Sequence, residues 1–212
     1  MNYKMVVFDL DGTLCNTLED LYEACNYALI QCNLPKISLD QTRNFIGNGI
    51  KNLLLRASDS QGDLEELLKH FQFYYNQNFA VYTKAYSDIE EVLKYCKKKN
   101  LIVGVLTNKV ETIAQKIIQT LFGNFFDFVY GEVPGRLKKP DPTFLLEIIR
   151  AYGLNPKEVL YIGDSEVDIR TTENASIRGV FVSYGFRDKL ELLQYTDCIA
   201  ETPLDLIQYI GE

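Results

Sequence analysis

The stretch Val6-Val7-Phe8-Asp9-Leu10-Asp11-Gly12-Thr13-Leu14 carries the strongest signal in this sequence. The apolar, partly β-branched residues before Asp9 predict a buried strand of a parallel sheet. Because Asp9 and Asp11 are two residues apart, an extended backbone places both side chains on one side. Two such carboxylates repel each other unless a cation lies between them, and Mg²⁺ suits hard oxygen ligands. We therefore expect a magnesium site at this position. Gly12 permits a tight turn and the close approach of a ligand to the backbone. The alternative is an acidic turn that only caps the next helix.

The composition is that of an ordinary globular protein. Of the 212 residues, 47% are hydrophobic and 24% are charged, and no apolar run approaches the ~20 residues of a membrane span. The net charge of −7 argues against nucleic acid as a partner, so an anionic substrate must be attracted by a local site. We expect a small-molecule substrate, no membrane partner, and a monomer or homodimer.

Histidine and cysteine usage narrows the chemistry. The single histidine, His70, excludes histidine triads and multi-histidine metal sites, so proton transfer falls to a carboxylate. The five cysteines are odd in number and form no Cys-x-x-Cys pair, which predicts neither a disulfide framework nor a zinc site. Reduced thiols, and a first strand that follows Met1 almost at once without a signal-peptide pattern, favour a cytoplasmic protein.

The apolar pattern divides the chain into two parts. Residues 16–84 predict helices only, over 18–32, 40–45, 50–57 and 64–82, and Thr17 with Asp20 resembles a capping box for the first. From residue 85, strands and helices alternate, which predicts a doubly wound parallel sheet of the Rossmann-like α/β class. We predict an α/β core domain of residues 1–15 and 85–212, with an all-helical cap domain of residues 16–84 inserted into it.

A second strand end carries a hydroxyl group. In Gly104-Val105-Leu106-Thr107-Asn108-Lys109, a strand predicted over 101–106 runs into Thr107, and a helix is predicted over 110–121. The Thr107 hydroxyl and the backbone amides of a helix start can hold phosphate oxygens. A Thr-Asn pair also commonly caps a helix, so this pattern leaves both interpretations open.

A lysine stands in a stiff loop before a later helix. In Lys138-Lys139-Pro140-Asp141-Pro142 the prolines restrict the backbone, and Pro142 is expected at the first helical position. Lys139 can therefore be held as a fixed cation, with a solvated surface lysine as the alternative.

The last candidate acids follow a third apolar strand. In Tyr161-Ile162-Gly163-Asp164-Ser165-Glu166-Val167-Asp168, the strand ends in glycine and Asp164, and Asp168 lies one helical turn further on. A capping acid and an exposed helix acid are the alternative for this pair.

These four segments, in this order, resemble the four motifs of the haloacid dehalogenase-like phosphohydrolases. The resemblance implies that Asp9 is a nucleophile that becomes phosphorylated and that Asp11 is the general acid/base. Thr107 and Lys139 would bind the transferring phosphoryl group, and Asn108 matches a residue that such phosphatases often carry. Mg²⁺ would be held by Asp9, Asp164 and the Asp11 main-chain carbonyl, with Asp168 supporting the site indirectly or through water.

The helical segment refines the resemblance. Phe45-Ile46-Gly47-Asn48-Gly49 looks like the loop found in phosphoglycolate phosphatases, so Asn48, like Gly12 and Asn108, is a candidate substrate-binding residue. Arg43 or Lys51 is a candidate for recognising an acidic leaving group, with a solvated helix charge as the alternative for each. The expected activity is Mg²⁺-dependent hydrolysis of small phosphorylated metabolites such as 2-phosphoglycolate. A β-phosphoglucomutase-like phosphomutase and a non-catalytic phospho-ligand binding protein are the alternatives, and a dehalogenase fits less well.

Overall fold

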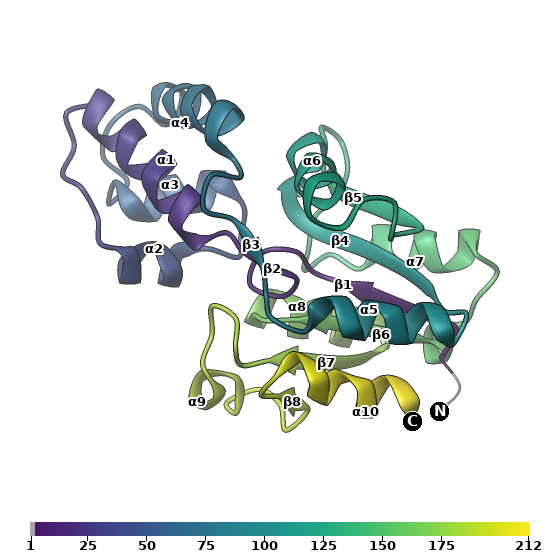
Figure 1. The fold of residues 1–212 in the computed structure, drawn as a ribbon. Helices are drawn as coiled ribbons and strands as arrows, with labels where there is room; N and C mark the ends of the chain where they lie inside the picture. Colours follow the sequence, from purple (N-terminus) through teal and green to yellow (C-terminus); the bar gives the residue numbers. More distant parts are fainter. Residues whose placement is uncertain (1–2) are drawn as a thin grey trace. The chain divides into compact units, whose positions relative to one another are not determined.

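A computed structural model describes residues 3–212 and divides them into two compact units. The α/β unit combines the amino-terminal segment up to Cys15 with Ala85–Glu212, and the helical unit is Asn16–Lys84. Where the chain passes between the units, β2 (Cys15–Asn16) and β3 (Lys84–Ala85) form a small two-stranded sheet (Figure 1). Along residues 3–212, no helix combines the length and apolar character that crossing a membrane requires.

The α/β unit is built on a parallel sheet, as predicted. Within residues 3–212 its strands run in the order β5-β4-β1-β6-β7-β8, and every neighbouring pair is parallel. They are β1 (Met5–Phe8), β4 (Ile102–Val110), β5 (Phe128–Glu132), β6 (Val159–Gly163), β7 (Arg178–Val182) and β8 (Ile199–Ala200). The strand order reverses at β1, and ligands of such sheets bind at the carboxyl ends of the strands beside this point.

Helices flank the sheet (Figure 1). They are α5 (Ile89–Lys98), α6 (Glu111–Phe122), α7 (Thr143–Ala151), α8 (Glu166–Ala175), α9 (Lys189–Leu192) and α10 (Leu206–Gly211), with short 3₁₀ turns at Pro156–Glu158 and Pro203–Asp205. Met5 and Val7 of β1 form one core cluster with Leu145 and Ile148 of α7 and Ala175 of α8. Helices α5 and α10 pack side by side. Because β1 is buried on all its residues, its sequence is an uninterrupted apolar run.

The helical unit consists of α1 (Leu18–Gln31), α2 (Leu39–Phe45), α3 (Ile50–Ala57) and α4 (Leu64–Asn78). Helix α1 packs along α4, and the ring of Tyr27 stacks on that of Tyr74 with 4.9 Å between centroids. The Ser38 hydroxyl accepts a hydrogen bond from Gln41 N–H, which caps α2.

The predicted capping box of Thr17 and Asp20 is wrong. Thr17 is the N-cap of α1 but makes no side-chain capping bond, and Asp20 is buried. The Asp20 carboxylate instead accepts hydrogen bonds from the backbone N–H of Tyr82 at 3.0 Å and of Thr83 at 2.8 Å, and from the Thr83 hydroxyl at 2.6 Å. This contact uses residues 82–83 in a non-helical form, so α4 ends at Asn78 rather than at residue 82.

Two boundaries in the α/β unit also differ from prediction. Strand β4 continues past Leu106 to Val110, with an irregular register against β5, so Thr107 lies in the strand and not at a helix start. Helix α7 begins at Thr143, where Pro142 is the N-cap and Asp141 Oδ1 accepts the Thr143 N–H at 2.9 Å. Helix α6, which follows β4, begins at Glu111, four residues after Thr107.

Candidate active site

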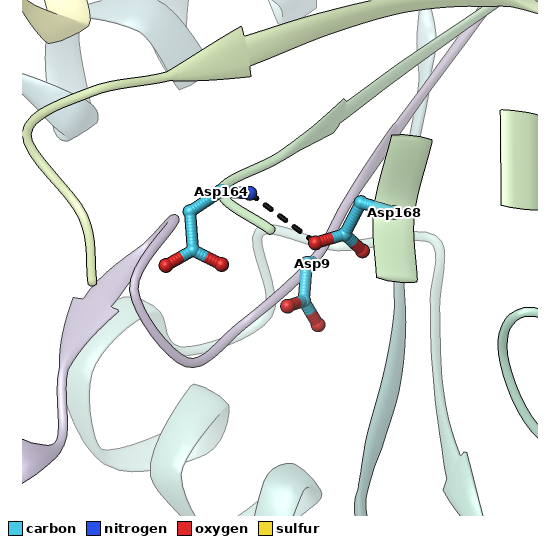
Figure 2. A group of neighbouring side chains, drawn as sticks. All are labelled: Asp9, Asp164 and Asp168. Atoms are coloured by element: carbon cyan, nitrogen blue, oxygen red, sulfur yellow. Dashed lines mark hydrogen bonds between the residues drawn. The ribbon is translucent and has the colours of Figure 1, made fainter. Parts of the chain in front are cut away.

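The carboxyl ends of β1, β4 and β6 bring the predicted residues of the α/β unit together. The Asp9 N–H donates to the carbonyl of Ile162 at 2.8 Å, which extends the pairing of β1 with β6 beyond Phe8. Asp164 follows β6 directly, and Asp168 lies in the first turn of α8. The side chains of Asp9, Asp164 and Asp168 lie close together (Figure 2).

These three aspartates form a buried acidic cluster. They are 7%, 2% and 0% exposed, and one carboxylate oxygen from each lies within 4.8 Å of the others. Burial raises the pKa of Asp9 to about 7; Lys139 opposes this rise, while Asp168 and Asp11 add to it. Burial also raises the pKa of Asp164, with contributions from Asp168 and Asp9. The cluster therefore favours added positive charge and offers hard oxygen donors, which fits a divalent cation.

Lys139 supplies one positive charge to this cluster. Its Nζ lies 2.9 Å from Asp9 Oδ1, 2.7 Å from Asp168 Oδ1 and 2.9 Å from the Tyr161 hydroxyl. Burial lowers the pKa of Lys139, but the adjacent Asp168 and Asp9 outweigh it and leave the pKa well above its ordinary value. Lys139 is thus a fixed, charged ammonium, whereas the neighbouring Lys138 pairs with Glu132 at 3.2 Å in a more exposed position.

Asp168 is the most fully hydrogen-bonded of the acids. Its Oδ2 accepts from the backbone N–H of Asp164 at 3.2 Å, the N–H of Ser165 at 3.1 Å and the Ser165 hydroxyl at 2.7 Å. Its Oδ1 accepts from Lys139 and from the Tyr161 hydroxyl at 3.0 Å. Because both oxygens are engaged, Asp168 is placed to hold the β6–α8 loop and Lys139, which favours an indirect role toward a metal.

Close backbone packing fixes Asp164. Its Oδ2 accepts the Phe186 N–H at 2.8 Å, and Gly12, at φ +83°, lies so near that a Cβ there would stand 2.0 Å from Asp164 Oδ2. A Cβ on Gly185 would stand 2.3 Å from the Gly12 carbonyl. Gly12 thus serves this packing, and its N–H donates to the Cys15 carbonyl at 2.9 Å; its role in substrate binding stays a prediction.

The polar residues of β4 have defined partners. Thr107 is buried, and its Oγ1 accepts the Lys109 N–H at 3.2 Å. The Asn108 side-chain amide donates to the Lys139 carbonyl at 3.0 Å, so this predicted substrate-binding residue supports the backbone that carries Lys139. Asn48 belongs to the helical unit, where its carbonyl accepts from the Asn52 side chain at 2.8 Å.

Sequence reasoning missed three residues of the site. Lys109 Nζ lies 2.9 Å and 3.2 Å from the two carboxylate oxygens of Asp11. Tyr161, buried in β6, has its hydroxyl oxygen 3.2 Å from the Leu106 carbonyl oxygen. Arg187 pairs with Glu166 at 3.1 Å and opposes the upward pKa shift of Asp164. The sequence does mark Tyr161, because a tyrosine within an aliphatic strand is unusual. No sequence pattern marks Arg187 as a site residue.

Comparison with known proteins places these features in a wider group. The model of the haloacid dehalogenase-like hydrolase family matches residues 6–182. A phosphoglycolate phosphatase of Aquifex aeolicus is 31% identical over 206 residues, covering 97% of this chain and 95% of its own length. One from Haemophilus influenzae is 32% identical over 198 residues, covering 87% of both chains. The crystal structure of a predicted phosphoglycolate phosphatase from Haemophilus somnus superposes with a TM-score of 0.92 at 30% identity, covering 99% of this chain and 98% of that one.

Proposed function

Because this chain belongs to the haloacid dehalogenase-like hydrolases and is a phosphatase similar to phosphoglycolate phosphatases, we propose that it hydrolyses small phosphorylated metabolites such as 2-phosphoglycolate, with Mg²⁺ and through an aspartyl-phosphate on Asp9. The observation that carries the proposal is the buried cluster of Asp9, Asp164 and Asp168 with Lys139 in contact with two of its members.

The acidic cluster supports a divalent-cation site. Asp9 and Asp164 would hold Mg²⁺ with the Asp11 main-chain carbonyl, and Asp168 would support them through its hydrogen bonds. The donor set is entirely oxygen, which matches the preference of Mg²⁺. Mg²⁺ would supply positive charge next to the nucleophile and the transferring phosphoryl group.

The chain's own residues account for each bond change. An Asp9 carboxylate oxygen attacks phosphorus while the bond to the leaving oxygen breaks, and Asp11 gives its proton to that oxygen. Asp11 then takes a proton from a water molecule, whose oxygen attacks phosphorus, and the P–O bond to Asp9 breaks. Inorganic phosphate leaves and the Asp9 carboxylate is restored. Lys139, which contacts Asp9, and the buried Thr107 hydroxyl would offset the negative charge that develops on the phosphoryl group.

Selectivity among phosphate esters needs residues other than these. The site residues of the α/β unit would bind only the phosphate group and the metal. We therefore propose that Asn48, with Arg43 or Lys51, contributes to substrate choice. Gly47 and Gly49, on either side of Asn48, have positive φ angles of 120° and 81°, a backbone form that suits close approach to a ligand. Cytoplasmic location and the oligomeric state stay predictions.

The activity assay follows phosphate release from 2-phosphoglycolate and p-nitrophenyl phosphate with Mg²⁺ or with a chelator. We expect release with Mg²⁺ only, loss of release in Asp9→Asn, and unchanged release in the control Asp40→Asn, an exposed acid of α2. An isomerised sugar phosphate with little free phosphate would instead indicate a phosphomutase. Binding of phosphate esters without turnover would indicate a non-catalytic binding protein.

A further inference from the structure

Asp11 is held by a lysine that the mechanism above does not use. The Nζ of Lys109 contacts both Asp11 oxygens, at 2.9 Å and 3.2 Å. The Lys109 side chain is only 3% exposed and that of Asp11 15% exposed, so the pair is largely shielded from water. A lysine is rarely this buried unless a specific partner compensates for the loss of hydration.

The backbone fixes both ends of this ion pair. Lys109 lies in the part of β4 that extends beyond Leu106, and its N–H donates to Thr107 Oγ1. Asp11 lies in a tight turn, in which the N–H groups of Leu14 and Cys15 both donate to the Leu10 carbonyl. The carboxylate of Asp11, which follows β1, is therefore held in place by a side chain of β4.

Such a pair is a poor device for stability alone. The dehydration of two buried charges offsets much of their attraction, and apolar replacements of buried pairs are often neutral or stabilising. A half-buried ammonium, such as that of Lys138 next to Glu132, keeps more of its hydration. The partner of Lys109 is Asp11, the proposed general acid/base, which lies two residues from the proposed nucleophile Asp9. This location suggests that the ion pair serves catalysis.

We propose that Lys109 is a positioning residue for Asp11, an inference that rests on the proposed function. Because Lys109 contacts both carboxylate oxygens, one oxygen can carry the transferred proton while the other still accepts the lysine's hydrogen bond. Lys109 thus holds Asp11 in one orientation while it gives a proton to the leaving oxygen and later takes one from water.

The leaving group provides the test. An alkoxide needs a proton to leave, whereas p-nitrophenolate is a weak base and leaves without one. The ratio kcat/KM reports the steps up to release of the leaving group, so the loss of Asp11 positioning lowers it for alkyl phosphates and spares p-nitrophenyl phosphate. General acid/base catalysis contributes about 10²–10⁴-fold, so partial misplacement should cost at least ~10-fold.

The experiment compares Lys109→Met and Lys109→Gln with wild type on three substrates. 2-Phosphoglycolate and glycerol 2-phosphate both have alkoxide leaving groups, but only the first has a carboxylate; p-nitrophenyl phosphate is the third. We expect kcat/KM to fall ~10-fold or more on both alkyl phosphates and less than ~3-fold on p-nitrophenyl phosphate, through kcat rather than KM. Lys109→Arg should restore part of the loss, and Lys138→Met is the matched control.

A second measurement shows whether Lys109 acts through Asp11. In the double variant Asp11→Asn with Lys109→Met, the loss of kcat/KM should equal that of Asp11→Asn alone. Once the Asp11 carboxylate is absent, the residue that positions it has no further effect. Independent, multiplying losses would overturn the inference. So would an equal loss on all three substrates, or a loss confined to 2-phosphoglycolate, which would mean that Lys109 reads the substrate carboxylate.

The inference and the proposed function fail in different ways. If wild type shows no Mg²⁺-dependent hydrolysis of any substrate, both are overturned. If wild type and Asp11→Asn behave as the mechanism requires while the Lys109 variants keep the wild-type pattern, the role of Lys109 alone is overturned.

Discussion

Lys139 Nζ lies 2.9 Å from Asp9 Oδ1 inside a cluster of buried acids. Replacing Lys139 with Met leaves Asp9 and Asp168 without their shared cation, and breaking one side of a buried pair typically costs 3–5 kcal/mol. We predict that Lys139→Met lowers the unfolding temperature in a chelator and reduces turnover at least ~10²-fold, the scale of a lost charge-stabilising group. Lys138→Met, one residue away, should change neither; equal effects of the two substitutions would contradict the assignment.

The Gly12–Asp164 contact predicts a defect in metal activation. Gly12→Ala introduces strain at φ +83° and a Cβ 2.0 Å from Asp164 Oδ2. Gly135 is the matched control, because it has φ +85° with nothing within 4 Å of its added Cβ. Both alanine variants should lose about 1–3 kcal/mol of stability from the backbone alone.

Only Gly12→Ala should also raise the Mg²⁺ concentration for half-maximal activity, since only it displaces Asp164. Metal titrations of the two variants measure this difference. If Gly12→Ala keeps the wild-type activation constant, the contact does not position a metal ligand.

Asp164 and Asp168 should separate metal binding from stability. Asp164→Ala removes a proposed ligand, so we predict a larger rise in the Mg²⁺ activation constant than in Asp168→Ala. Asp168→Ala removes hydrogen bonds to Lys139, Tyr161 and the Ser165 loop, so it should lower the unfolding temperature more. Metal titration and thermal unfolding of both variants check this, and equal behaviour in both assays would show that the two acids share one role.

The acidic cluster predicts an unusual pH dependence of stability. Burial raises the pKa of Asp9 from 3.8 to about 7, so between these values the folded, metal-free protein keeps a proton that the unfolded chain loses. The folded state then binds more protons, and its stability falls as pH rises through this window. Unfolding temperatures in a chelator should therefore drop from pH 5.5 to 7.5, with a smaller drop in Asp9→Asn or with Mg²⁺ present. The same slope under all three conditions would refute the prediction.

The sequence predicted the parallel sheet and the acids at its edge because these depend on local pattern. An apolar run that ends in an acid identifies both the strand and the position of Asp9 or Asp164. The length of the run predicts where the strand ends. The apolar pattern of β4 ends at Leu106, however, and the strand continues through polar residues because β5 pairs with its far end at Val110.

Contacts between distant segments could not be predicted in this way. Lys109 contacts Asp11, and Thr83 contacts Asp20, although the partners lie far apart in the sequence. Lysine and aspartate side chains are usually exposed, so the sequence alone gives no reason to expect these contacts. The burial of Asp168 is of the same kind, because a helix acid is exposed unless partners such as Lys139 and Tyr161 come from other elements.

Trapping the phosphorylated enzyme shows directly whether Asp9 is the nucleophile. Wild type mixed with 2-phosphoglycolate and Mg²⁺, quenched in acid within one turnover and digested, should yield the peptide containing Asp9 with one added phosphoryl group. Asp9→Asn should yield none, and omission of Mg²⁺ should reduce the yield strongly. Phosphate release by wild type without any such peptide, or the same label on the Asp9→Asn protein, would contradict the assignment of Asp9 as the nucleophile.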